Sequence, residues 1–106
     1  MAVRLNVDRD ALAALCRRHA IRRLSLFGSF ANGSESPDSD VDLLVEFEPD
    51  DEPGLIGLAG IERELSQLLS GRRVDLRTPA DLSPYFRDDV LTSAEVQFDS
   101  RRWYVR

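Results

Sequence analysis

The feature that most constrains this chain is a Gly-Ser pair followed, after ten residues, by two aspartates that one residue separates. The pair is Gly28 and Ser29, and the aspartates are Asp40 and Asp42. In a β-strand, residues two apart point to the same face, so these carboxylates would lie side by side. They repel each other unless a cation lies between them, and Mg²⁺ suits one or two carboxylates completed by phosphate oxygens and water. The spacing therefore indicates a metal and phosphate site.

The residues before the aspartates predict the phosphate half of such a site. A short buried strand over 22–27 is interrupted by Gly28 and Ser29, and a short helix is expected to begin at Phe30. This order places free backbone N–H groups and a hydroxyl at a helix N-terminus, where phosphates bind. Gly28 has no Cβ to block the approach of a phosphate. A Gly-Ser pair alone is typical of a turn, and Asp-x-Asp alone of a solvated strand edge, so the combination carries the interpretation.

The composition excludes several kinds of nucleotide chemistry. All 14 basic residues are arginine, which excludes a P-loop lysine, a kinase-type lysine and a lysyl-nucleotide intermediate. The net charge of −5 argues against direct nucleic-acid binding, because gripping a phosphate backbone needs a basic face. With a single cysteine, Cys16, and a single histidine, His19, we expect neither an internal disulfide nor a zinc site. Nucleotide chemistry on this chain would rely on metal and carboxylates.

The length of 106 residues, with 42% hydrophobic and 31% charged residues, is typical of one globular domain. No apolar run approaches the length of a membrane span and the N-terminus lacks a signal-peptide pattern, so we expect a cytoplasmic protein. We expect a single domain over 1–106, with its core over about 8–98 and a C-terminal tail over 99–106. The end of the tail, Arg-Arg-Trp-Tyr-Val-Arg, fits a weakly docked terminus and a partner-binding segment equally well.

The apolar periodicity predicts alternating helices and strands, and therefore an α/β fold. A first helix, capped by Asp8, is expected to run to about His19. Strands over 22–27 and 40–47 follow, separated by a polar loop over 33–39. The residues expected on the buried side of the first helix are Leu12, Leu15 and Cys16.

The second half of the chain is predicted to hold two more helices and one more strand. The acidic segment 48–54 is typical of a solvated linker, and a long helix over 55–70 follows it. Gly71 ends this helix, a strand forms around Asp75, and the last helix covers 82–94. The apolar stripe of the long helix that we expect to face the core consists of Leu55, Leu58, Ile61, Leu65 and Leu68.

The segment LFGSFANGSESPDSDVDLLVEF resembles the signature of the DNA polymerase β-like nucleotidyltransferase superfamily. Within it, the chain resembles the minimal nucleotidyltransferase (MNT) domains that serve as antitoxins of HEPN-type toxins, from the first helix to about Val96. The resemblance implies a small mixed β-sheet flanked by helices. It also implies a third carboxylate from a neighbouring strand, which Asp75 matches.

The resemblance implies an Mg²⁺-dependent nucleotidyltransferase that uses ATP. Asp40, Asp42 and Asp75 would be its catalytic residues and would hold a two-metal site. Asp75 would complete the metal that activates the incoming hydroxyl. That hydroxyl attacks the α-phosphorus and pyrophosphate leaves.

The expected nucleotide-binding residues are Gly28, Ser29, Asn32 and Arg77. The family commonly has a basic residue where this chain has Asn32, which can hydrogen-bond a phosphate oxygen but carries no charge. Arg77 lies two residues after Asp75 on the same strand face, where it could supply that charge. A solvated arginine on the strand is an equally good interpretation of Arg77.

The acceptor that the resemblance implies is a tyrosine hydroxyl of a HEPN-type RNase toxin, which the transferred AMP would silence. The chain would then be the antitoxin of a toxin–antitoxin pair and would form a complex with that toxin. One alternative is a small-molecule nucleotidyltransferase of the aminoglycoside-modifying kind, although such enzymes usually need extra chain around the acceptor. The other is an antitoxin that masks its toxin by contact alone, an alternative that Asn32 keeps open.

Overall fold

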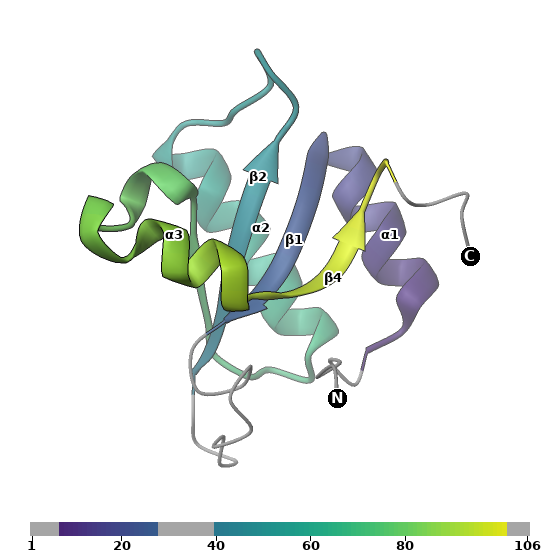
Figure 1. The fold of residues 1–106 in the computed structure, drawn as a ribbon. Coiled ribbons are helices and arrows are strands. Elements are labelled where there is room, and N and C mark those ends of the chain that lie inside the picture. The colour runs from purple at the N-terminus through teal and green to yellow at the C-terminus, as the bar shows by residue number, and fades with distance from the viewer. Residues whose placement is uncertain (1–6, 28–39, 102–106) are drawn as a thin grey trace.

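The structure is a computed structural model that describes residues 7–27 and 40–101. Its strands form a four-stranded sheet in the order β3-β2-β1-β4 (Figure 1). Strand β1 is antiparallel to both β2 and β4, whereas β2 is parallel to β3. The mixed sheet flanked by helices is therefore confirmed. In chain order the elements are α1 (Arg9–Arg18), β1 (Ile21–Phe27), β2 (Val41–Phe47), α2 (Leu55–Leu68), β3 (Val74–Arg77), the 3-10 helix η1 (Pro79–Asp81), α3 (Pro84–Ser93) and β4 (Glu95–Asp99).

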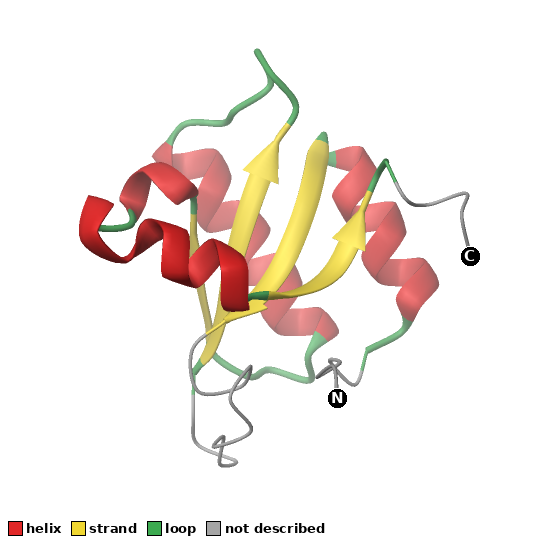
Figure 2. Ribbon diagram, viewed as in Figure 1, coloured by secondary structure: helices red, strands yellow, loops and turns green. Residues whose placement is uncertain are grey.

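The helices lie on two sides of the sheet. Helices α1 and α2 pack behind it in the view of Figure 1, and α3 crosses in front. The colouring of Figure 2 separates these layers, with β4 following directly after α3. In the part of the chain that the structure describes, every helix is too short or too polar to cross a membrane.

Helix α1 begins and packs as its sequence predicts. The Asp8 carboxylate accepts hydrogen bonds from the backbone N–H groups of Asp10 at 3.0 Å and Ala11 at 3.3 Å, which caps the helix. Leu12, Leu15 and Cys16 are all buried. Burial raises the pKa of the Cys16 thiol to about 12, so this side chain stays protonated and serves as a small apolar residue of the core.

The core lies between the sheet and the pair α1 and α2. Alternate residues of β2 point into it, and Val41, Leu43 and Val45 are inaccessible to solvent. From α2, Ile61 and Leu65 meet them with exposures of 2% and 1%. This alternation leaves the intervening residues of β2 on the opposite face of the sheet.

The prediction that Leu55 belongs to the core was wrong. Its exposure is 86%, and that of its neighbour Ile56 is 89%. The first turn of α2 lies beyond the core, and packing of the stripe against the core begins at Leu58. Leu68 also packs against the core while remaining partly exposed.

Two strands lie at the edges of the sheet, and each is held in place by a side chain from a helix. The Glu62 carboxylate of α2 accepts a hydrogen bond from the backbone N–H of Leu76 in β3, at 2.9 Å. Arg9 of α1 donates to the side-chain oxygen of Gln97 in β4, at 3.1 Å. The sequence did not predict β4, because Phe98 is the only one of its five residues that is buried.

Candidate functional site

The sheet face turned away from α1 and α2 carries the candidate carboxylates. In the pairing of the strands, Phe27 of β1 lies opposite Asp42 of β2, and Asp42 lies opposite Asp75 of β3. Because paired residues point to the same face, these three side chains form one row across the sheet. Parallel pairing thus places two carboxylates from segments 33 residues apart next to each other.

Asp40 lies directly before β2, at the same end of the sheet as this row. Next to it, the backbone N–H of Val41 donates to the carbonyl of Arg73 at 2.8 Å, which joins the start of β2 to the start of β3. The Arg73 guanidinium lies 3.8 Å from a carboxylate oxygen of Asp40, and both side chains are exposed. An exposed pair of this kind contributes little stability, so it leaves Asp40 available to a ligand.

Arg77 lies at the carboxylate row, as its spacing from Asp75 predicted. Its Nε and one terminal nitrogen donate to the same Asp75 oxygen, at 3.3 and 3.1 Å. This hydrogen bonding raises the pKa of Arg77, which is therefore charged at any physiological pH. The guanidinium is half exposed, so it can contact an incoming anion while it remains beside Asp75.

Asp42 is the central carboxylate of the group. Burial contributes most to raising the pKa of its carboxyl, and the negative charges of Asp75 and Asp40 raise it further. The nearby Arg77 offsets only part of this effect. The surroundings of Asp42 therefore carry an excess of negative charge, which a bound cation would relieve.

The donor chemistry fits a hard cation, although the carboxylates are not gathered into a cage. Within 7–27 and 40–101, no three Asp, Glu, His or Cys side chains are placed to hold one metal ion. Asp40 and Asp75 instead pair with Arg73 and Arg77, because adjacent carboxylates repel each other and each arginine attracts one of them. Mg²⁺ needs only one or two carboxylates beside phosphate oxygens and water, so Asp40 and Asp42 suffice for it.

The other sequence-predicted residues have different outcomes. Gly28, Ser29 and Asn32, expected to bind nucleotide, lie outside the described residues. Sequence reasoning did not assign Phe27 to the site, and its place in the row follows from the β1–β2 register. The apolar strand that ends directly before the Gly-Ser turn was the available signal for it.

Comparison with known proteins agrees with this geometry. A family model described as a nucleotidyltransferase domain matches residues 9–96. The protein adenylyltransferase MntA of Thermococcus cleftensis is 39% identical over 77 residues, which cover 73% of this chain and 75% of that protein.

Two solved structures have a similar fold. One, described as a candidate minimal nucleotidyltransferase, is 42% identical with a TM-score of 0.68, and the match covers 81% of this chain and 85% of that one. The other is a tri-AMPylated HEPN toxin of Shewanella oneidensis in complex with MNT antitoxin. It matches with a TM-score of 0.61 and 20% identity over 89% of this chain and 71% of that one, a likeness of fold.

Proposed function

The chain belongs to the nucleotidyltransferase-domain family, and on this premise we propose that it transfers AMP from ATP to a HEPN-type toxin and so acts as an antitoxin. The observation that carries the proposal is the register that places Asp42 opposite Asp75, with Asp40 directly before the same strand. The adenylyltransferase name of the Thermococcus relative and the AMPylated toxin in the Shewanella complex support the choice of donor and acceptor.

The carboxylates have separate tasks in the proposed reaction. Asp40 and Asp42 would hold Mg²⁺ together with the triphosphate, and Asp75 would be a ligand of a second metal ion. When bound, the metal neutralises phosphate charge and makes the acceptor hydroxyl easier to deprotonate. Asp75 is the side chain that we assign to take that proton. The hydroxyl oxygen forms a bond to the α-phosphorus, the bond to the β-phosphate oxygen breaks, and pyrophosphate leaves.

The ATP and the acceptor hydroxyl are also assigned in this proposal. We assign Gly28, Ser29 and Asn32 to the phosphates of ATP, with Arg77 supplying the charge that Asn32 lacks. We assign the acceptor to a tyrosine hydroxyl of the toxin. The protein substrate implied by the names of the relatives makes a small-molecule acceptor the weaker assignment.

A second candidate function is an antitoxin that masks the toxin without catalysis. Asn32 favours it, since the amide that stands in place of the family's usual basic residue carries no charge to hold a triphosphate. The two functions differ in one result: a masking antitoxin still neutralises the toxin after Asp42 is replaced.

Intact-mass spectrometry of the acceptor tests the proposal. We expect a HEPN toxin from the same genome to gain one or more AMP units after incubation with this protein, Mg²⁺ and ATP. The Asp40→Ala/Asp42→Ala double variant, run in parallel, should produce no gain. An unmodified toxin that still forms a stable complex with the wild-type chain would overturn catalysis and support masking.

Arg77 provides a test of the nucleotide-binding assignment. Arg77→Gln should weaken the binding of Mg²⁺-ATP by about tenfold, because a charge-assisted hydrogen bond to a phosphate is lost. Arg73→Gln is the matched control, since Arg73 also pairs with a carboxylate of the site but is more exposed. Titration calorimetry would measure both dissociation constants. Equal effects of the two substitutions would show that Arg77 acts only through the general charge of the site.

A further inference from the structure

Helix α3 lies beside the candidate site without belonging to the core. None of its ten residues is buried, whereas α1 and α2 both bury apolar side chains. A helix this short is marginal by itself, because most helix stability in proteins comes from packing an apolar face. Within the described part of the chain, α3 therefore exposes side chains that could pack against another molecule.

Polar contacts, in place of apolar burial, fix the position of α3. The Arg87 guanidinium donates to the backbone carbonyls of Pro79 at 2.8 Å and Leu82 at 3.1 Å, which ties α3 to η1. The Ser83 hydroxyl accepts from the backbone N–H of Tyr85 at 3.3 Å and caps the helix. Because η1 directly follows β3, these bonds tie the start of α3 to the segment that leaves the strand carrying Asp75.

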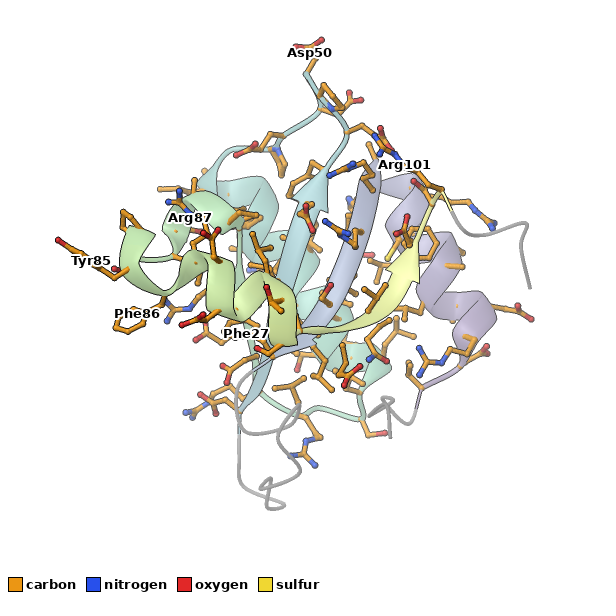
Figure 3. The ribbon with its side chains drawn as sticks, viewed as in Figure 1. Phe27, Asp50, Tyr85, Phe86, Arg87 and Arg101 are labelled. Atoms are coloured by element: carbon orange, nitrogen blue, oxygen red, sulfur yellow. The ribbon has the colours of Figure 1, made fainter. Side chains whose placement is uncertain are left out.

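The outward side of α3 combines aromatic and acidic groups. Tyr85 is 89% exposed and Phe86 is 62% exposed, and Figure 3 shows both side chains pointing away from the sheet. Asp88 and Asp89 are both exposed and lie three and four residues after Tyr85, which places them one helical turn away from it. We call Tyr85, Phe86, Asp88 and Asp89 the α3 surface. Aromatic residues exposed together in this way are typical of the anchors of protein interfaces.

From these contacts we infer that the α3 surface is the docking site of the acceptor protein, an inference that rests on the proposed AMP transfer. A protein acceptor must place one hydroxyl at the carboxylates. Helix α3, which Arg87 ties to η1, is the helix that follows β3, the edge strand that carries Asp75. The occupant is a protein surface with an apolar hollow for the two rings and basic groups around it for Asp88 and Asp89. The net charge of −5 favours a basic partner over a second copy of this chain, which would repeat the acidic groups.

Paired substitutions on two helices test the inference. Tyr85→Ser/Phe86→Ser should weaken binding to a purified HEPN toxin from the same genome by about thirtyfold or more, because two anchors are lost. Leu55→Ser/Ile56→Ser is the matched control, since these residues are also adjacent, apolar and exposed, but on α2. We expect the control to bind within about threefold of wild type, as non-anchor positions do. Biolayer interferometry would give the dissociation constants, and circular dichroism would check that each variant is folded.

Three results would separate this inference from the proposed function. Wild-type binding by the α3 variant, or equal weakening in the α2 control, would overturn docking at α3 whether or not AMP is transferred. Loss of binding in the α3 variant alone, with no AMP transfer by the wild type, would uphold docking and overturn catalysis. A wild-type dimer in light scattering that the α3 substitutions dissociate would assign the surface to self-association and overturn the inference.

Discussion

Replacement of Asp42 by asparagine should reduce AMP transfer by about a thousandfold or more, as loss of a central catalytic group commonly does. Asparagine keeps the size of the side chain, so the pairing of this position with Phe27 and Asp75 in the sheet can persist. It removes the negative charge needed to hold a cation against the triphosphate. The initial rate of toxin modification at saturating Mg²⁺ and ATP would measure the effect.

The same substitution should make the metal-free protein more stable. Burial and the neighbouring carboxylates raise the pKa of Asp42 above its ordinary value of 3.8, so the folded state binds this proton more tightly than the unfolded state does. Stability therefore falls as pH rises from 3.8 through the raised pKa, and the cost of the charge is fully present at neutral pH. The Asp42→Asn variant carries no such cost, and its melting temperature in chelator at pH 7 should exceed that of the wild type.

Together, the rate of AMP transfer and the melting temperature distinguish a variant that has lost only the site from one that no longer folds. Mg²⁺-ATP should raise the melting temperature of the wild type but not that of Asp42→Asn, because ligand binding stabilises only a protein with an intact site. Wild-type turnover by the variant would contradict the role of Asp42 in catalysis. A lower melting temperature in chelator would show that its carboxylate stabilises the fold.

The parts of the fold that the sequence predicted are those that depend on neighbours along the chain. Asp8 caps α1 through two N–H groups of the next turn, a contact that any helix beginning there would make. The exposure of Leu55 depends instead on where the sheet ends relative to α2. The spacing of apolar residues along a helix gives no information about that. Strand β4 depends on pairing with β1, about 70 residues earlier in the chain, and its exposed Val96 hides the alternation.

The same distinction applies to the candidate site. The contact between Arg77 and Asp75 follows from a spacing of two residues within one strand. The pair formed by Arg73 and Asp40 requires the parallel pairing of β2 with β3 and was therefore not predictable from spacing. The raised pKa of Asp42 likewise arises from burial and from Asp75 on the neighbouring strand. Local sequence thus identified Asp40, Asp42, Asp75 and Arg77 as candidates, whereas their pairing and charge depend on the sheet.

Two leucines of α2 offer a sharp test of the packing. Leu65→Ala should lower the free energy of unfolding by about 2–5 kcal/mol, because a side chain 1% exposed would leave a cavity between helix and sheet. Leu55→Ala makes the same chemical change in the same helix, but at a side chain that is 86% exposed. We expect it to change stability by less than about 0.5 kcal/mol. Urea unfolding followed by circular dichroism would give both values.

The destabilisation expected of Leu65→Ala should also affect the candidate site. A loss of about 2–5 kcal/mol is a large share of the roughly 5–15 kcal/mol that stabilises a typical domain. Leu65 packs in the same core as Val41 and Leu43, which flank Asp42 in β2. Leu65→Ala should therefore reduce AMP transfer near its lowered melting temperature while leaving transfer at low temperature intact. Equal destabilisation by Leu55→Ala would mean that the first turn of α2 packs against the core, contrary to its exposure in this structure.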